Sequence, residues 1–168
     1  FGHSLARSLI GAANQGNFKP SPAPSLKVKT SEIELGIDNF MLSLATLVGI
    51  VDSDPKLHLT PPFVRYSSEV AYIKLGNATI TAIPGELYPE IAVGGIENPY
   101  GADFETAPQE VPNLRSQLPG EVNLMVNLAN DAIGYIIPRS EWDDATPWIY
   151  GEEEETYGEI VSLGPDTG

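Results

Sequence analysis

Two glutamates follow the clearest strand pattern of the sequence, and carboxylates in such a place serve either structure or chemistry. The alternating run TITAI, residues 79–83, is broken by Pro84-Gly85, after which Glu86 opens a segment with helical spacing. A glutamate in the first turn of a helix is favoured by the helix dipole. At the carboxyl end of a strand, a glutamate is also well placed as a metal ligand or a general base. Glu90 lies one helical turn further, so the pattern predicts that the two carboxylates share a face.

A tyrosine in a second segment has a similar pair of interpretations. Residues 130–142 read NDAIGYIIPRSEW, in which Asn130 and Asp131 predict a turn and Gly134 allows close backbone approach before Tyr135. A tyrosine in this position is often buried, with its hydroxyl bonded to the backbone. It can also serve a site, as a ligand or as a donor to an oxyanion.

The histidines and the acidic run give weaker signals. His3 and His58 are far apart, whereas a two-histidine metal motif needs close spacing on one element, so we expect each to be a surface or capping residue. By themselves they do not make an ordinary catalytic zinc site of three protein ligands. The run EEEE at 152–155 is typical of a solvated acidic loop, and calcium binding is the alternative, although the sequence has no EF-hand spacing there.

The elements that must position these residues predict the α+β class. A helix, a loop rich in Pro and Ser, a strand and a second helix capped by Asp38 come first. A hairpin with a Gly-Asn turn, a long excursion and a strand that continues after a turn complete the pattern. We expect a mixed sheet covered by helices, as a single domain over residues 1–168 or as the C-terminal portion of a larger one. The predicted helices are 3–14, 39–50, 139–144 and the segment that begins at Glu86, and the predicted strands are 26–35, 68–75, 78–83 and 122–128.

Composition and charge exclude several classes of protein. The 168 residues include 23 acidic and 9 basic side chains, and the net charge of −14 argues against nucleic-acid binding, since phosphate contacts need clustered Lys and Arg. The chain has no cysteine, which excludes disulfides, thiolate metal sites and cysteine nucleophiles. No apolar run reaches the roughly 20 residues of a membrane span. The chain starts at Phe1 without an initiator methionine or a signal peptide, so we expect a piece of a longer protein.

Two stretches together resemble a known family. TITAIPGELYPEIAVGG at 79–95, followed by NLANDAIGYIIPRSEW at 127–142, resembles the neutral (alkaline, non-lysosomal) ceramidase family and its bacterial and archaeal relatives. The later YGEIVSLGPDTG fits the order of that family's motifs. The opening FGHSLARSLIGAAN is similar to the helix that follows the first half of the family's catalytic domain.

The resemblance implies a zinc-dependent amidohydrolase that splits the N-acyl bond of ceramide or another lipid-like amide, within a larger α/β sandwich-like hydrolase domain. It implies that Glu86 is a zinc ligand and that Tyr135 is a weak ligand or stabilises the oxyanion. If the family's ligand is the first of its paired tyrosines, that position is Ile133 here, and Tyr135 is only a neighbour. Pro138 and Trp142 depart from the family's pattern and leave the substrate open. A secreted or periplasmic location is one expectation, although the residues leave the compartment open.

The zinc histidines and the serine of the family belong to its first half, so the resemblance implies that the N-terminal half of the same protein is a partner of this chain. A non-catalytic binding or assembly protein of the same family is the competing interpretation, and an unrelated α+β binding module is a third. We expect Glu86 just past a strand end, at the start of a helix and in a cleft, with Tyr135 beside it. We also expect that the chain alone holds zinc weakly and does not hydrolyse amides at a useful rate.

Overall fold

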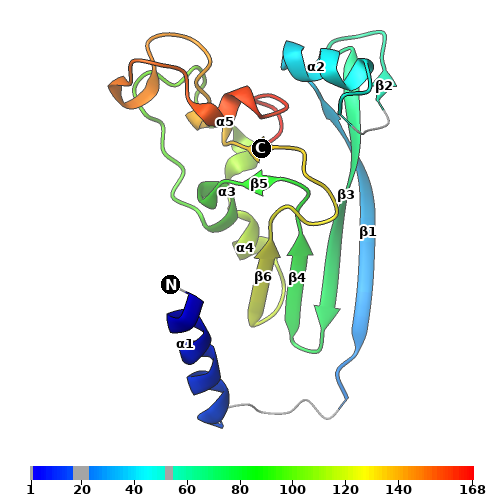
Figure 1. The fold of residues 1–168 in the computed structure, drawn as a ribbon, viewed down its shortest axis with the longest axis vertical. Coiled ribbons are helices and arrows are strands. Elements are labelled where there is room, and N and C mark those ends of the chain that lie inside the picture. The colour runs from blue at the N-terminus through cyan, green and yellow to red at the C-terminus, as the bar shows by residue number, and fades with distance from the viewer. Residues whose placement is uncertain (1, 17–22, 52–54) are drawn as a thin grey trace.

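The computed structural model describes residues 2–16, 23–51 and 55–168, and it has the predicted α+β class (Figure 1). The helices are α1 (Gly2–Asn14), α2 (Phe40–Leu47), α3 (Pro89–Val93), α4 (Leu114–Gln117) and α5 (Tyr157–Ile160). The strands are β1 (Leu26–Gly36), β2 (Lys56–Leu57), β3 (Val64–Leu75), β4 (Ala78–Ala82), β5 (Glu86–Leu87), β6 (Val122–Val126) and β7 (Tyr135–Ile136). Short 3₁₀ turns cover Pro108–Glu110, Arg139–Glu141 and Ile149–Gly151. Within the described ranges, no helix is both long and apolar enough to cross a membrane.

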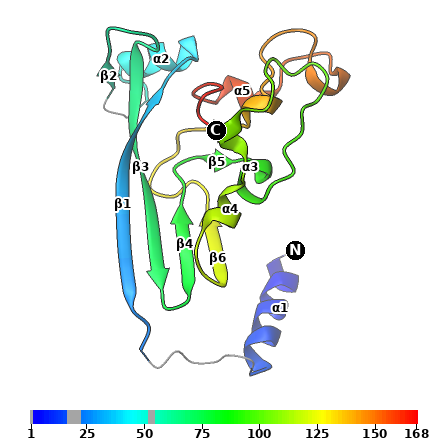
Figure 2. The same ribbon diagram turned by 180° about the vertical axis from the view of Figure 1, so that it is seen from behind.

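The main sheet is mixed, as predicted. Its strand order is β1-β3-β4-β6, and β2 pairs with β3 at one end. Strands β1, β3 and β4 are antiparallel, whereas β6 lies parallel to β4 (Figures 1 and 2). The TITAI and VNLMVNL segments are therefore neighbours in the sheet. Gly76 makes the β3–β4 turn with a positive φ of 62°, which glycine adopts without steric cost.

A second, two-stranded sheet lies beyond the carboxyl ends of β4 and β6. It consists of β5 and β7 in parallel, and β5 lies past the arrowheads of β4 and β6 in Figure 1. The segment after β6 was expected to continue that strand after a turn, but it joins β5 instead. The chain turns between β6 and β7 at Leu128 and Asn130, both of which have positive φ.

The hydrophobic core fills the region between the main sheet and the small one. Its buried members are Ile37, Val64, Tyr66, Ile83, Leu87, Ile91, Ile133, Ile136 and Leu163. The carboxylate of Asp131 fixes the loop before β7 against β3, because it accepts hydrogen bonds from the Tyr66 hydroxyl at 3.1 Å and the Ser68 hydroxyl at 2.8 Å. This anchor holds β7 beside the end of the main sheet.

The first two helix predictions were right in place and wrong in one cap, whereas the predicted helix 139–144 is only the 3₁₀ turn Arg139–Glu141. Helix α1 has the predicted bounds to within one residue, while α2 ends at Leu47, three residues before the expected end. The N-cap of α2 is Asn39 and not Asp38: the Asn39 side chain accepts a hydrogen bond from the Leu42 backbone N–H at 3.1 Å. The Asn39 amide also donates to the carbonyl of Ile160 at 3.0 Å, so this cap joins α2 to α5. A carboxylate could not make that second bond.

Candidate functional site

Two glycines allow close backbone approach around β7, Gly85 on the side of β5 and Gly134 on the side of the C-terminal segment at Val161. The Glu86 N–H donates to the Gly134 carbonyl at 2.8 Å, and the Tyr88 N–H donates to the Ile136 carbonyl at 3.1 Å. Gly134 has a φ of 92°, and a Cβ there would lie 1.9 Å from the Val161 carbonyl oxygen. A Cβ on Gly85 would lie 2.7 Å from the Gly134 carbonyl oxygen. Close backbone approach was predicted at Gly134, and Gly85 is required for the same reason.

Glu86 lies in a strand, which corrects the expectation that it begins a helix. It is the first residue of β5, four residues after β4 ends, and α3 begins only at Pro89. Consequently Glu86 and Glu90 do not share one helix face. This corrects the prediction made from their spacing. The Glu86 side chain is exposed and does not line the cleft described below, so that part of the expectation is also wrong.

The expected convergence of Glu86 and Tyr135 is confirmed. The two residues are direct register partners in the parallel β5–β7 pair, so their side chains leave the same face of the small sheet. The Tyr135 phenol lies close enough to the Glu86 carboxylate for the two groups to interact electrostatically. The negative charge of Glu86 is the largest cause of the raised pKa of Tyr135, and desolvation adds to it. Tyr135 is therefore a protonated donor at neutral pH.

The structure also separates the two positions considered for the tyrosine. Ile133 is only 5% exposed and belongs to the hydrophobic core, whereas Tyr135 is half-buried and directly faces Glu86. Of these two positions, only 135 presents its side chain to the carboxylate.

A third segment supports the pair from the C-terminal side. Ser162 is fully buried, forms an isolated parallel bridge with Tyr135, and donates its hydroxyl to the Tyr135 carbonyl at 2.8 Å. The ring of Tyr135 makes edge-to-face contacts with Tyr88 and Tyr157, each with centroids 6.2 Å apart. No individual sequence pattern had identified Tyr88, Tyr157 or Ser162 as residues of the site. Only the order of the motifs had placed the segment from Tyr157 onward near the site.

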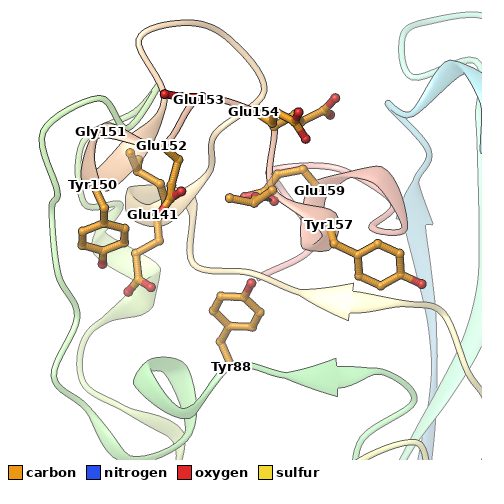
Figure 3. Close-up of a pocket in the computed structure, with 12 residues that line it drawn as sticks. Tyr88, Glu141, Tyr150, Gly151, Glu152, Glu153, Glu154, Tyr157 and Glu159 are labelled. Carbon is orange, nitrogen blue, oxygen red and sulfur yellow. Dashed lines mark hydrogen bonds between the residues drawn. The ribbon is translucent and has the colours of Figure 1, made fainter.

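Beside this pair lies a cleft of about 860 Å³ (Figure 3). Tyr88 points its hydroxyl towards the cleft from one side, and Glu141 and Glu159 come from the segments that cover it. Its outer wall is the acidic run 152–155, which is exposed, as predicted for a solvated loop. Tyr88 and Tyr157 line the cleft and also touch the Tyr135 ring, so they connect it with the Glu86–Tyr135 pair.

The two buried carboxyl groups of the cleft hold protons unusually well. Burial raises the pKa of Glu141 to about 7, and the nearby charge of Glu90 adds to the effect. Burial likewise raises the pKa of Glu159 to about 7, although backbone N–H groups, including that of Asp143, oppose the shift. Burial, followed by the charges of Glu159 and Glu141, raises the pKa of Tyr88 to about 12. At neutral pH the cleft therefore contains two partly protonated carboxyl groups and a neutral phenol.

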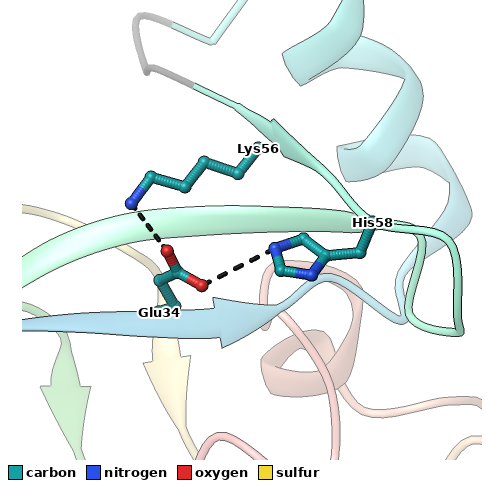
Figure 4. Close-up of polar contacts among 3 residues, drawn as sticks. All are labelled: Glu34, Lys56 and His58. Carbon is teal, nitrogen blue, oxygen red and sulfur yellow. Dashed lines mark hydrogen bonds and ion pairs between the residues drawn. The ribbon is translucent and has the colours of Figure 1, made fainter.

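The residues present fit part of a metal site. The Glu86 carboxylate and the Tyr135 phenol are adjacent oxygen donors on one face, but an ordinary catalytic zinc site needs a third protein ligand. In the part of the chain that the structure describes, no group of three or more His, Asp or Glu side chains is arranged to hold a metal. His58 lies 3.6 Å from Glu34, which also pairs with Lys56 at 2.6 Å (Figure 4), and His3 is exposed on α1. Neither histidine completes the set.

The fold and the site define an α+β protein with a carboxylate–phenol pair beyond a sheet end and an acidic cleft beside it. Comparisons with protein-family models, with curated proteins and with solved structures found no match.

Proposed function

We propose that this chain is the C-terminal portion of a zinc-dependent, ceramidase-like amidohydrolase that cleaves an N-acyl amide bond. One observation carries the proposal: Glu86 and Tyr135, named from the motif resemblance as ligands of one metal, are register partners on one face of the small sheet although 49 positions separate them in sequence. Their location beyond the carboxyl ends of β4 and β6 is a usual place for a site in sheet proteins.

In this proposal, Glu86 binds the metal and Tyr135 acts next to it. Zinc in such a site polarises the amide carbonyl and activates water. A cation held by Glu86 would offset the negative charge that is the largest cause of the raised pKa of Tyr135. Tyr135 then coordinates weakly or donates a hydrogen bond to the developing oxyanion. The edge contacts of Tyr88 and Tyr157 hold the Tyr135 ring in place.

The remaining ligands must come from other residues of the intact protein. We propose that its N-terminal half supplies the zinc histidines and the serine, and that a lipid-like amide is the substrate. The proposal does not involve nucleic acid, because the net charge is −14. The incomplete ligand set among the described residues favours one alternative, a non-catalytic binding or assembly protein derived from the same family.

Zinc titration calorimetry on this chain, with a parallel assay of fatty-acid release, tests the assignment. We expect weak zinc binding and no useful turnover from the chain alone. Binding should weaken at least tenfold in Glu86→Gln and fall in Tyr135→Phe. Glu152→Gln, which removes the same charge from an exposed position, should bind like the unmodified chain.

Three outcomes separate the interpretations. Zinc affinity that is unchanged in both Glu86→Gln and Tyr135→Phe would remove the metal assignment and favour the non-catalytic alternative. Tight stoichiometric binding with turnover, both lost in Glu86→Gln, would make this chain a complete enzyme and contradict the proposed need for an N-terminal half. Turnover that appears only when the chain is joined to an upstream half bearing a spaced pair of histidines would support the proposal in full.

A further inference from the structure

One face of the main sheet is apolar across all four long strands. Residues that are register partners, or two apart along a strand, lie on the same face. We call this set the apolar face; all its members except Thr30 are apolar: Leu26, Val28, Thr30, Ala71, Ile73, Leu75, Ala78, Ile80, Ala82, Val122, Leu124 and Val126. The opposite face carries mostly polar side chains, among them Lys27, Lys29, Lys74, Thr79, Thr81 and Asn123.

The outer strands of the apolar face are open to solvent, whereas Ala71 and Ala82 on the inner strands are buried. The members of the face on β1 and β6 are strongly exposed, with Val28 at 56% and Leu124 at 50%. An apolar sheet face normally packs against another layer of structure. Exposed apolar area of this kind marks an interaction surface.

Helix α1 has an apolar stripe that is also exposed and has no other layer packed against it among the described residues. Leu5, Leu9 and Ile10 are each more than half exposed, and no residue of α1 is buried. In Figures 1 and 2 the ribbon of α1 stands apart from the sheet. An isolated helix of 13 residues is only marginally stable in water, so α1 needs a surface on which to pack.

Charge favours the rest of this same chain as that surface. Helix α1 contains one basic side chain, Arg7, and no acidic one, whereas residues 32–168 contain five basic and 23 acidic side chains. The positive charge of α1 is therefore attracted to the acidic body of the molecule. The register partners Glu32 and Glu69 extend the rows of the apolar face at one end, so the attraction acts near that face.

The dimensions agree as well. A helix of 13 residues is about 20 Å long, and four strands side by side span about 15 Å. The 11 residues between α1 and β1 reach at most about 40 Å when extended, which is enough to fold α1 back over the sheet. A tether of that length gives an effective concentration in the millimolar range, so a weak contact suffices.

We propose that α1 docks with its apolar stripe on the apolar face of its own chain, as a layer that covers the sheet. The proposal is independent of the metal assignment, because neither surface includes Glu86, Tyr135 or a residue of the cleft. A second copy donating its α1 in exchange is the competing occupant.

Amide hydrogen exchange of α1 tests the docking directly. In the unmodified chain, α1 amides should exchange at least tenfold more slowly than in a peptide of residues 2–14. Leu9→Lys in the stripe and Val28→Lys on the apolar face should each remove that protection. Ser8→Lys on the other side of α1 and Ser31→Lys on the other face of β1 add the same charge to exposed positions and should leave it intact.

A nitroxide on Ala13→Cys, unique because the chain has no other cysteine, gives a second measurement. It should broaden the methyl resonances of Val28, Val122 and Leu124 equally at high and low protein concentration. Unprotected α1 amides, or protection lost equally in the control variants, would overturn the proposal. Protection and broadening that vanish on dilution would overturn it in favour of exchange between two copies.

Discussion

The small sheet and the apolar face are held in contrasting ways. In the small sheet, the backbone is fixed by glycines at close contacts and by buried polar partners such as Ser162. On the apolar face, regular pairing fixes the strands, yet the side chains of the outer strands face solvent. The stability of the small sheet therefore depends on a few specific contacts. The stability of the apolar face depends on the apolar area that another layer of structure buries. The region with constrained backbone and shifted pKa values is also the one where chemistry is expected.

The largest effect should come from the glycine that joins β7 to the C-terminal segment. Gly134→Ala introduces a Cβ 1.9 Å from the Val161 carbonyl oxygen and an unfavourable φ of 92°. We expect a loss of about 4 kcal/mol in the free energy of unfolding, measured by urea denaturation. Gly95→Ala is a matched control, since Gly95 has a φ of 97° and open space around its Cβ position. It should cost about 1 kcal/mol, and equal losses in the two variants would show that strain in φ, rather than the contact, dominates.

The buried carboxyl groups of the cleft should make stability depend on pH. The pKa values of Glu141 and Glu159 rise from an ordinary 4.5 to about 7 on folding, so between those values the folded chain binds more protons than the unfolded chain. Their contribution to stability is complete below about pH 4.5 and is lost as the pH rises through about 7. Replacing both by Gln should raise the free energy of unfolding at pH 8 by about 1–2 kcal/mol, after allowance for solvent screening.

The control for this pH effect is the exposed acidic run. Glu152→Gln removes one charge without relieving burial, so its effect at pH 8 should stay within about 0.5 kcal/mol. Urea unfolding at pH 5 and pH 8 separates the two cases. A double Gln variant that is less stable than the unmodified chain at pH 8 would show that hydrogen bonds to these carboxylates outweigh their desolvation.

The cap of α2 joins that helix to α5, and the effect of removing it should be smaller. Asn39→Ala removes the bond to the Leu42 N–H and the bond to the Ile160 carbonyl, and we expect a loss of about 1 kcal/mol. Asp38→Asn should be neutral or slightly stabilising, because burial raises the pKa of Asp38 and its charge is therefore unfavourable there. Thermal unfolding of the two variants checks the assignment. A larger loss in Asp38→Asn would restore the cap position expected from sequence.

The strands and turns that depend on local sequence patterns could be predicted from the sequence. The period of the TITAI and VNLMVNL runs was enough to identify β4 and β6, and the Gly76-Asn77 pair located the hairpin turn. Local pattern failed at Glu86, because the two-residue strand β5 exists only through pairing with β7, 49 positions away. It also could not separate Asp38 from Asn39 as the cap, since the deciding partner, Ile160, is distant in sequence. The raised pKa values of Glu141 and Glu159 depend on burial, which no spacing in the sequence reveals.

The finest test of the small sheet is the titration of Tyr135. Its pKa is raised chiefly by the Glu86 charge, so Glu86→Gln should lower the pKa of Tyr135 towards its ordinary value of 10. The chain has seven tyrosines, so the titration of Tyr135 is isolated by difference. The ultraviolet absorbance of each protein is compared with that of the same protein carrying Tyr135→Phe.

Glu90→Gln is a suitable control, because the Glu90 charge acts on Tyr88 and Glu141 and is not among the causes of the Tyr135 shift. Zinc should act in the same direction as Glu86→Gln, since a cation at the carboxylate offsets its charge. If zinc lowers the Tyr135 pKa equally in the presence and absence of the Glu86 carboxylate, the ion binds elsewhere, and the interaction between Glu86 and Tyr135 is purely structural.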